Sequence, residues 1–113
     1  MSSLIQIIPL NTVATANFTS ASLDTFILPV TFKRRSIGLQ VISSSLSTSD
    51  ATIKIQESND DVNYTDIPSA TITLLTGSTV NTLFTDLRLR YIRIVFTKNT
   101  NAAGTISGIA NLI

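Results

Sequence analysis

The density of β-branched residues constrains this fold more than any other feature of the sequence. Ile, Val and Thr together supply 38 of the 113 residues, and their branched side chains favour extended backbone. In several segments, apolar and polar residues alternate with a period of two, as in strands with one buried face. No segment combines the i, i+3, i+4, i+7 apolar spacing of an amphipathic helix with capping residues. The chain is therefore predicted to be all-β.

The alternation also locates the strands. Residues 51–57 place Ile53 and Ile55 on one face, and residues 90–96 place Ile92, Ile94 and Phe96 on one face. Further strands are predicted at residues 36–42, 70–74 and 104–110, with weaker candidates at 4–8, 12–18, 25–28 and 80–84. Turns are predicted where Asn, Asp, Gly, Pro and Ser gather, at residues 59–63, 68–69, 76–78 and 98–101.

Strands of this length and spacing are typical of an antiparallel β-sandwich, here jelly-roll-like with about 8 strands. The length fits a single domain over residues 1–113. Both ends of the chain are apolar. Residues 1–10 are therefore expected to form either an N-terminal arm or an edge strand.

Composition excludes several functional classes. The chain has no Cys and no His, so it lacks a thiolate nucleophile, the usual general base and the common zinc ligands. For a Ser or Thr hydroxyl to act as a nucleophile, a lysine would have to serve as its general base. Only Lys33, Lys54 and Lys98 are present. We therefore expect no enzyme activity, no catalytic residues, no cofactor and no metal site.

Charge and hydropathy argue against nucleic-acid and membrane partners. The net charge is +1, whereas nucleic-acid-binding domains are usually strongly basic. No apolar run approaches the ~18 residues of a membrane helix. The first basic residue is Lys33, so the basic segment that opens a signal peptide is missing. The protein is expected to be made in a cytoplasm.

Two polar clusters each allow two interpretations. Asn59, Asp60, Asp61, Asn63 and Asp66 offer oxygen ligands for Ca²⁺, but Asn and Asp side chains also stabilise turns, which we favour. A second cluster joins residues 33–35 with Arg88, Arg90 and Arg93. It could form a basic patch, but Asp61, Asp66 and Asp86 are close enough in sequence to form salt bridges with it.

Residues 57–67 (ESNDDVNYTDI) resemble the Ser-Asn-Asp-Gly-x-x-Trp hairpin of discoidin-like (galactose-binding-like) jelly rolls. Residues 90–94 (RYIRI) resemble that family's Arg-Tyr-x-Arg-Ile motif at a matching spacing. The resemblance covers residues 38–95 and extends to small β-sandwich domains of phage and prophage virion proteins. Asp61 replaces the glycine and Tyr64 the tryptophan; Asp tolerates the left-handed conformation that such a turn needs.

The resemblance implies a virion structural protein, most simply an auxiliary (decoration or cement) capsid protein of a bacteriophage. Its partners would be the major capsid protein, other virion proteins and further copies of itself. The low charge, 13% of residues, fits such a role, because weakly charged surfaces favour association. Neutral residues such as Thr71, Thr73, Thr105 and Ser107 are expected to face outward.

Two other functions remain open. One is a discoidin-type carbohydrate-binding module, in which Tyr64, Tyr91 or the five Phe residues would stack on sugars, although a core also needs such residues. The other is a tail or fibre adhesion subunit. For the favoured virion role, the expected partner contacts are Leu4, Ile5, Ile7, Arg34, Arg35, Leu112 and Ile113.

Overall fold

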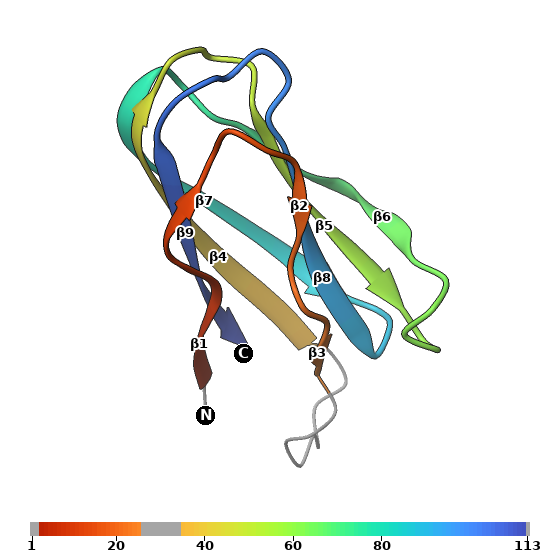
Figure 1. Ribbon diagram of the computed structural model, residues 1–113. Helices are drawn as coiled ribbons and strands as arrows, with labels where there is room; N and C mark the ends of the chain where they lie inside the picture. Colours follow the sequence, from red (N-terminus) through yellow and green to blue (C-terminus); the bar gives the residue numbers. More distant parts are fainter. Residues whose placement is uncertain (1–2, 26–34, 113) are drawn as a thin grey trace.

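The computed structural model describes residues 3–25 and 35–112, which form nine β-strands and no helix. The strands are β1 (Ser3–Val13), β2 (Phe18–Thr19), β3 (Leu23–Asp24), β4 (Arg35–Leu46), β5 (Thr52–Ser58), β6 (Thr65–Thr73), β7 (Gly77–Leu87), β8 (Tyr91–Thr97) and β9 (Thr105–Leu112). One sheet has the order β1-β9-β4-β7, and the other has the order β2-β8-β5-β6 with β3 also paired to β8. All pairs are antiparallel. The predicted antiparallel β-sandwich is confirmed (Figure 1).

The strand pairing is that of a jelly roll. β1 pairs with β9, β2 and β3 with β8, β4 with β7, and β5 with β6. These pairs are nested, so the described chain is one long hairpin. It is rolled into two sheets by the additional pairs β4–β9 and β5–β8. Because β2 and β3 are two halves of one interrupted strand along β8, the roll corresponds to the predicted eight strands.

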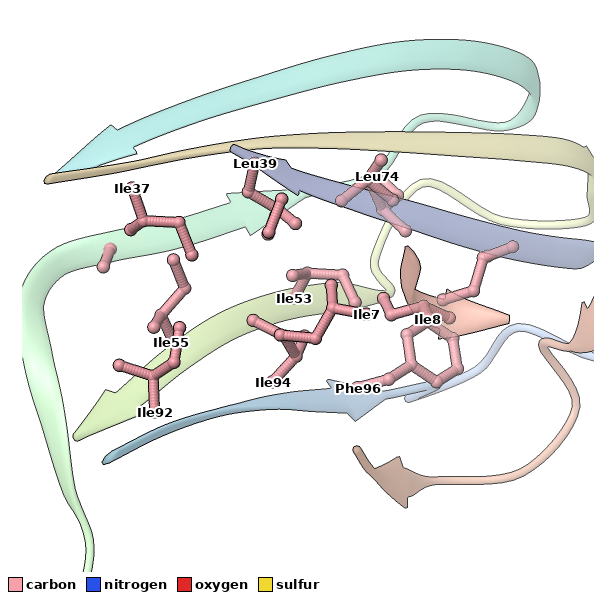
Figure 2. Close-up of a cluster of buried hydrophobic side chains, with 14 of the residues drawn as sticks. Ile7, Ile8, Ile37, Leu39, Ile53, Ile55, Leu74, Ile92, Ile94 and Phe96 are labelled. Carbon is pink, nitrogen blue, oxygen red and sulfur yellow. The ribbon is translucent and has the colours of Figure 1, made fainter. Parts of the chain in front are cut away.

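The core lies between the sheets and is built mainly from the alternating isoleucines. Ile37, Leu39, Ile53, Ile55, Ile92, Ile94 and Phe96 are at most 1% exposed. Figure 2 shows Ile37 and Leu39 of one sheet facing Ile53, Ile55, Ile92 and Ile94 of the other. In β5 and β8 the buried positions follow the predicted period of two.

The N-terminal segment is an edge strand rather than an arm over the residues described. β1 runs beside β9, so the two ends of the chain lie together (Figure 1). A register shift between Gln6 and Ile8 breaks the alternation, and as a result Ile7 and Ile8 are both buried. A Cβ on Gly108 would lie 3.0 Å from Ile8 Cδ1, so a larger residue there would require Ile8 to shift.

Two sequence-based expectations differ from the structure, and a third lies mostly outside the described residues. Residues 12–18 are not one strand, because β1 ends at Val13 and β2 begins at Phe18. Residues 68–69 are not a turn between strands but lie within β6, where a register shift against β5 accommodates Pro68. Thr25 follows β3, and the rest of the weak candidate at 25–28 lies outside the described residues.

β7 is longer than the weak candidate at 80–84, because it pairs with β4 over almost its whole length. Among the described residues, no helix is long and apolar enough to span a membrane.

Candidate interaction surfaces

The outer face of the β1-β9-β4-β7 sheet carries exposed apolar side chains, and we call it the neutral face. Strand register places Leu4, Asn111, Gly38 and Phe84 side by side across all four strands. The remaining side chains that alternate outward include Gln6, Ser36, Gln40, Ile42, Val80, Thr82, Asp86 and Ile109. Leu4 is 74% exposed, Phe84 63% and Val80 60%. Monomeric proteins seldom leave such side chains grouped on one face.

The neutral face contains a single ionisable side chain among those described. It is Asp86, near the end of β7, where its Oδ1 accepts a hydrogen bond of 2.9 Å from Ser36 Oγ. The rest of the face is aliphatic, aromatic, hydroxyl or amide. A protein partner could therefore cover it without desolvating a row of charges, which is the costly part of burying polar surface.

A shallow hollow of about 410 Å³ lies in the middle of the neutral face. Its floor is Gly38, which has no side chain, and Leu4 and Phe84 belong to its lining. Asn111 also lines the hollow, and its buried Oδ1 accepts no hydrogen bond within the described part of the chain. A buried acceptor without a donor is unfavourable. The apolar side chains that line the hollow suit an apolar group of a partner.

The outer face of the other sheet is different, because its charges are paired with one another. The Arg93 guanidinium lies 4.1 Å from the centre of the Tyr64 ring, and its Nε donates to Gln56 Oε1 at 2.8 Å. Gln56 Nε2 donates to Asp66 Oδ1 at 2.8 Å, and Lys54 Nζ donates to Asp66 Oδ2 at 3.2 Å. These bonds from Gln56 and Lys54 hold the pKa of Asp66 below its ordinary value.

Among the described side chains, Arg88, Arg90 and Arg93 do not form one basic patch. Arg88 Nη2 lies 2.5 Å from Oε2 of the buried Glu57, and Arg90 binds Asp24 through two hydrogen bonds of 3.0 and 2.7 Å. The sequence predicts Asp61, Asp66 and Asp86 as salt-bridge partners of this cluster, and the described partners of Arg88 and Arg90 are Glu57 and Asp24. The carboxylates that bind Arg88 and Arg90 come instead from other strands, which the sequence order does not reveal.

The segment 59–66 is a tightly bonded turn. The Asp60 carboxylate accepts hydrogen bonds from Ser58 Oγ, the Val62 and Asn63 amides and the Asn63 side chain. These donors, the Asn63 amide first, lower the pKa of Asp60. The described residues contain no group of three or more acidic side chains arranged to hold a metal. Turn hydrogen bonding accounts for Asp60 in this cluster.

The substitutions in the resembling hairpin are accommodated. Asp61 has φ of 60°, the left-handed conformation expected where the family has glycine. The Tyr64 hydroxyl donates to Asp61 Oδ1 at 2.5 Å. Burial and this hydrogen bond raise the pKa of Tyr64 to about 12.

The residues expected to make partner contacts are spread over different environments. Leu4 lies exposed on the neutral face, whereas Ile5 and Leu112 are half-buried. Ile7 is only 9% exposed. The β1 bulge turns it into the core, so it has a packing role rather than the expected contact role. Arg34 and Ile113 lie outside the described residues, and Arg35 begins β4.

The sequence interpretation missed Gly38, Val80 and Phe84 as surface residues. Alternation within residues 78–86 places Val80 and Phe84 on one side of a strand, but it does not reveal which side faces water. Ser107 was expected to face outward and is only 7% exposed. Strand register places it on the outer side of β9, opposite Ile42, so its side is as expected and only its exposure differs.

Comparisons with known proteins give similarities in structure and none in sequence. No family model matches the chain, and no curated protein matches its sequence. A chain in the structure of infectious bursal disease virus Gx strain aligns with it at a TM-score of 0.44 and 16% sequence identity. The alignment covers 100% of this chain and only 32% of that chain.

Proposed function

We propose that this chain is an auxiliary (decoration or cement) capsid protein of a bacteriophage, which acts in the virion by packing against other proteins and without catalysis. The observation that carries the proposal is the neutral face, where exposed apolar side chains surround a hollow. Its proposed partner is the major capsid protein or another virion protein.

The neutral face has the chemistry of an interface core. Cores of protein–protein interfaces are depleted in charge and enriched in aromatic residues. Fully burying a Leu or Phe side chain contributes about 1.5–3 kcal/mol before the costs of association are subtracted, so covering the exposed Leu4 and Phe84 favours binding. The paired charges on the opposite sheet remain solvated, which suits a side that faces away from the shell.

The virion assignment depends on the sequence resemblance of residues 38–95 to small sandwich domains of phage particles. Jelly rolls recur in viral capsids and in lectins, so the fold is compatible with both the favoured role and a carbohydrate-binding one. Fold alone does not decide between them.

The aromatic side chains favour packing over sugar binding. A sugar platform needs aromatic rings open to solvent. Among the described aromatic side chains, only that of Phe84 is largely exposed. It lies within a sheet rather than at a loop end. The rings of Tyr64 and Tyr91 have arginine guanidinium groups at 4.1 and 5.1 Å from their centres.

A reconstitution experiment tests the proposal. Full-length protein is added to virus particles purified from cells that lack its gene, and co-sedimentation is measured. We expect binding that Leu4→Lys weakens by at least about tenfold, because it places a charge in an apolar interface. Gly38→Leu, which fills the hollow, should weaken it similarly.

The matched control is Thr73→Lys, which adds the same charge to an exposed position on β6 of the other sheet. It should bind like the wild-type protein. Equal loss in Thr73→Lys and Leu4→Lys would contradict docking through the neutral face. Absence of binding to particles, together with binding on a glycan array, would replace the proposal with the carbohydrate-binding alternative. Binding to isolated tails or fibres but not to heads would favour the adhesion alternative.

A further inference from the structure

β7 is an edge strand whose outer side pairs with no strand in the described structure. Edge strands expose a row of backbone N–H and C=O groups, and natural proteins usually protect them with prolines, bulges, charges or short length. The described strands form four such edges: β1 and β7 in one sheet, and β6 and the successive strands β2 and β3 in the other. They differ in how well they are protected.

Three of the edges carry protective features. β1 contains Pro9, two register shifts and Asn11 in a left-handed conformation. β6 contains Pro68, a register shift and Ser69 in a left-handed conformation. β2 and β3 are two residues each.

β7 has none of these features over most of its length. It spans 11 residues without proline, and its pairing with β4 is regular from Thr79 to Leu87. Its one charged residue, Asp86, lies near the end of the strand. A long, regular and nearly uncharged edge favours the addition of another strand.

We propose that β7 pairs antiparallel with β7 of a second copy of this chain, which joins two four-stranded sheets into one continuous sheet. Full overlap of Gly77–Leu87 puts the two-fold axis at Thr82, so Thr82 lies opposite Thr82 of the other copy. The neutral faces of both copies then lie on the same side. This pairing involves the strand edge, so it does not depend on the virion role.

The sequence of β7 suits a second copy as the occupant. In this register each Val80 lies opposite Phe84 of the other copy, an aromatic–β-branched cross-strand pair that stabilises sheets. Each Asp86 lies opposite Ser78, so no like charges face each other. Such a contact is isologous and closes as a dimer rather than growing into a fibre.

Disulfide trapping tests the register, because the native chain contains no cysteine. Directly opposite residues in an antiparallel pair have Cα atoms about 4.5–5.5 Å apart, within the range that a disulfide spans. Thr82→Cys should therefore form a covalent dimer under mild oxidation. Thr71→Cys, equally exposed on the protected edge strand β6, is the control and should remain monomeric. Equal cross-linking of both variants, or none of Thr82→Cys, would overturn the proposal.

A charge exchange tests self-association without a covalent bond. Thr82→Lys and Thr82→Asp each place like charges opposite each other and should each weaken dimerisation by about tenfold in light scattering. Mixing the two variants pairs opposite charges and should restore the dimer, which also shows that both variants fold. A wild-type monomer at all attainable concentrations, or a mixture no tighter than the separate variants, would refute β7 pairing.

Discussion

At the scale of single residues, Gly38 and Gly104 show two different uses of a missing Cβ. A Cβ on Gly38 would meet only Phe84 Cδ2, at an ordinary 3.9 Å. Gly104 has φ of 93°, and a Cβ there would lie 2.3 Å from the Ser44 carbonyl oxygen. Gly38 therefore shapes the surface, whereas Gly104 is required by the backbone.

Alanine substitutions at Gly38 and Gly104 should change the free energy of unfolding in opposite directions. Gly38→Ala is expected to raise the free energy of unfolding by about 0.5 kcal/mol, because glycine in a strand loses more chain entropy on folding. Gly104→Ala should lower it by more than about 2 kcal/mol, because both the φ angle and the backbone contact resist a side chain. Urea denaturation of both variants measures the difference. Equal effects of the two substitutions would contradict this assignment.

Asp60 makes the stability of the turn depend on pH. Hydrogen bonds from its own turn lower its pKa below the ordinary 3.8. The resulting stabilisation is present above about pH 4 and is lost as pH falls toward the folded-state pKa. In urea titrations, the unfolding midpoint of wild type should therefore fall more steeply below pH 4 than that of Asp60→Asn. Parallel pH profiles would show that Asp60 is not responsible.

Residue chemistry predicts some local conformations and not others. Asp61, Asn11 and Asn99 adopt positive φ, and Asn and Asp are the residue types that tolerate it best. Ser45 and Ser69 also have positive φ, which their residue type does not indicate. Those two positions are imposed by the register shifts of β4 and β6, which depend on the partner strands.

At the scale of the elements, one buried asparagine joins three segments. Asn101 is fully buried, and its Nδ2 donates to the carbonyl oxygens of Ala14 and Ala103 at 2.7 and 2.8 Å. Its Oδ1 accepts from the Ser47 amide at 2.8 Å. The side chain thus links the end of β1 to the loops that follow β4 and precede β9.

Asn101→Ala should therefore lower the free energy of unfolding by about 3 kcal/mol, because several backbone groups near the core lose their partner. Asn81→Ala is a suitable control, because Asn81 is half-buried and its amide donates to Thr79 Oγ1. It should cost less than about 1 kcal/mol. Chemical denaturation measures the free energy of unfolding of both variants. Similar losses would mean that the Asn101 hydrogen bonds do not stabilise the fold more than an ordinary surface contact does.

The strands of the core could be predicted because their patterns are local. β5 and β8 each show period-two alternation within seven residues, so both positions and faces follow from the sequence. The Pro68 bulge and the β1 bulge could not be predicted, since each arises where one strand must match a partner distant in sequence. The salt bridges of Arg88 and Arg90 were missed for the same reason.

At the scale of the whole molecule, the two outer faces have opposite character. One sheet keeps its charges in a network that includes Arg93, Gln56, Asp66 and Lys54. The other exposes Leu4, Val80 and Phe84 with Asp86 at its margin. The low overall charge indicated an associating protein. Only the pairing of β1, β9, β4 and β7 shows that these apolar residues share one face, because Leu4 comes from β1 and Val80 and Phe84 come from β7, far away in sequence.

We propose that this protein packs on a virus shell through its neutral face. A cryo-electron microscopy map of particles from the organism that encodes the chain tests it most directly. We expect copies of the sandwich bound to the shell with the β1-β9-β4-β7 sheet, including Leu4 and Phe84, against it. Particles without the sandwich, or with the sheet containing Lys54 and Arg93 against the shell, would contradict it.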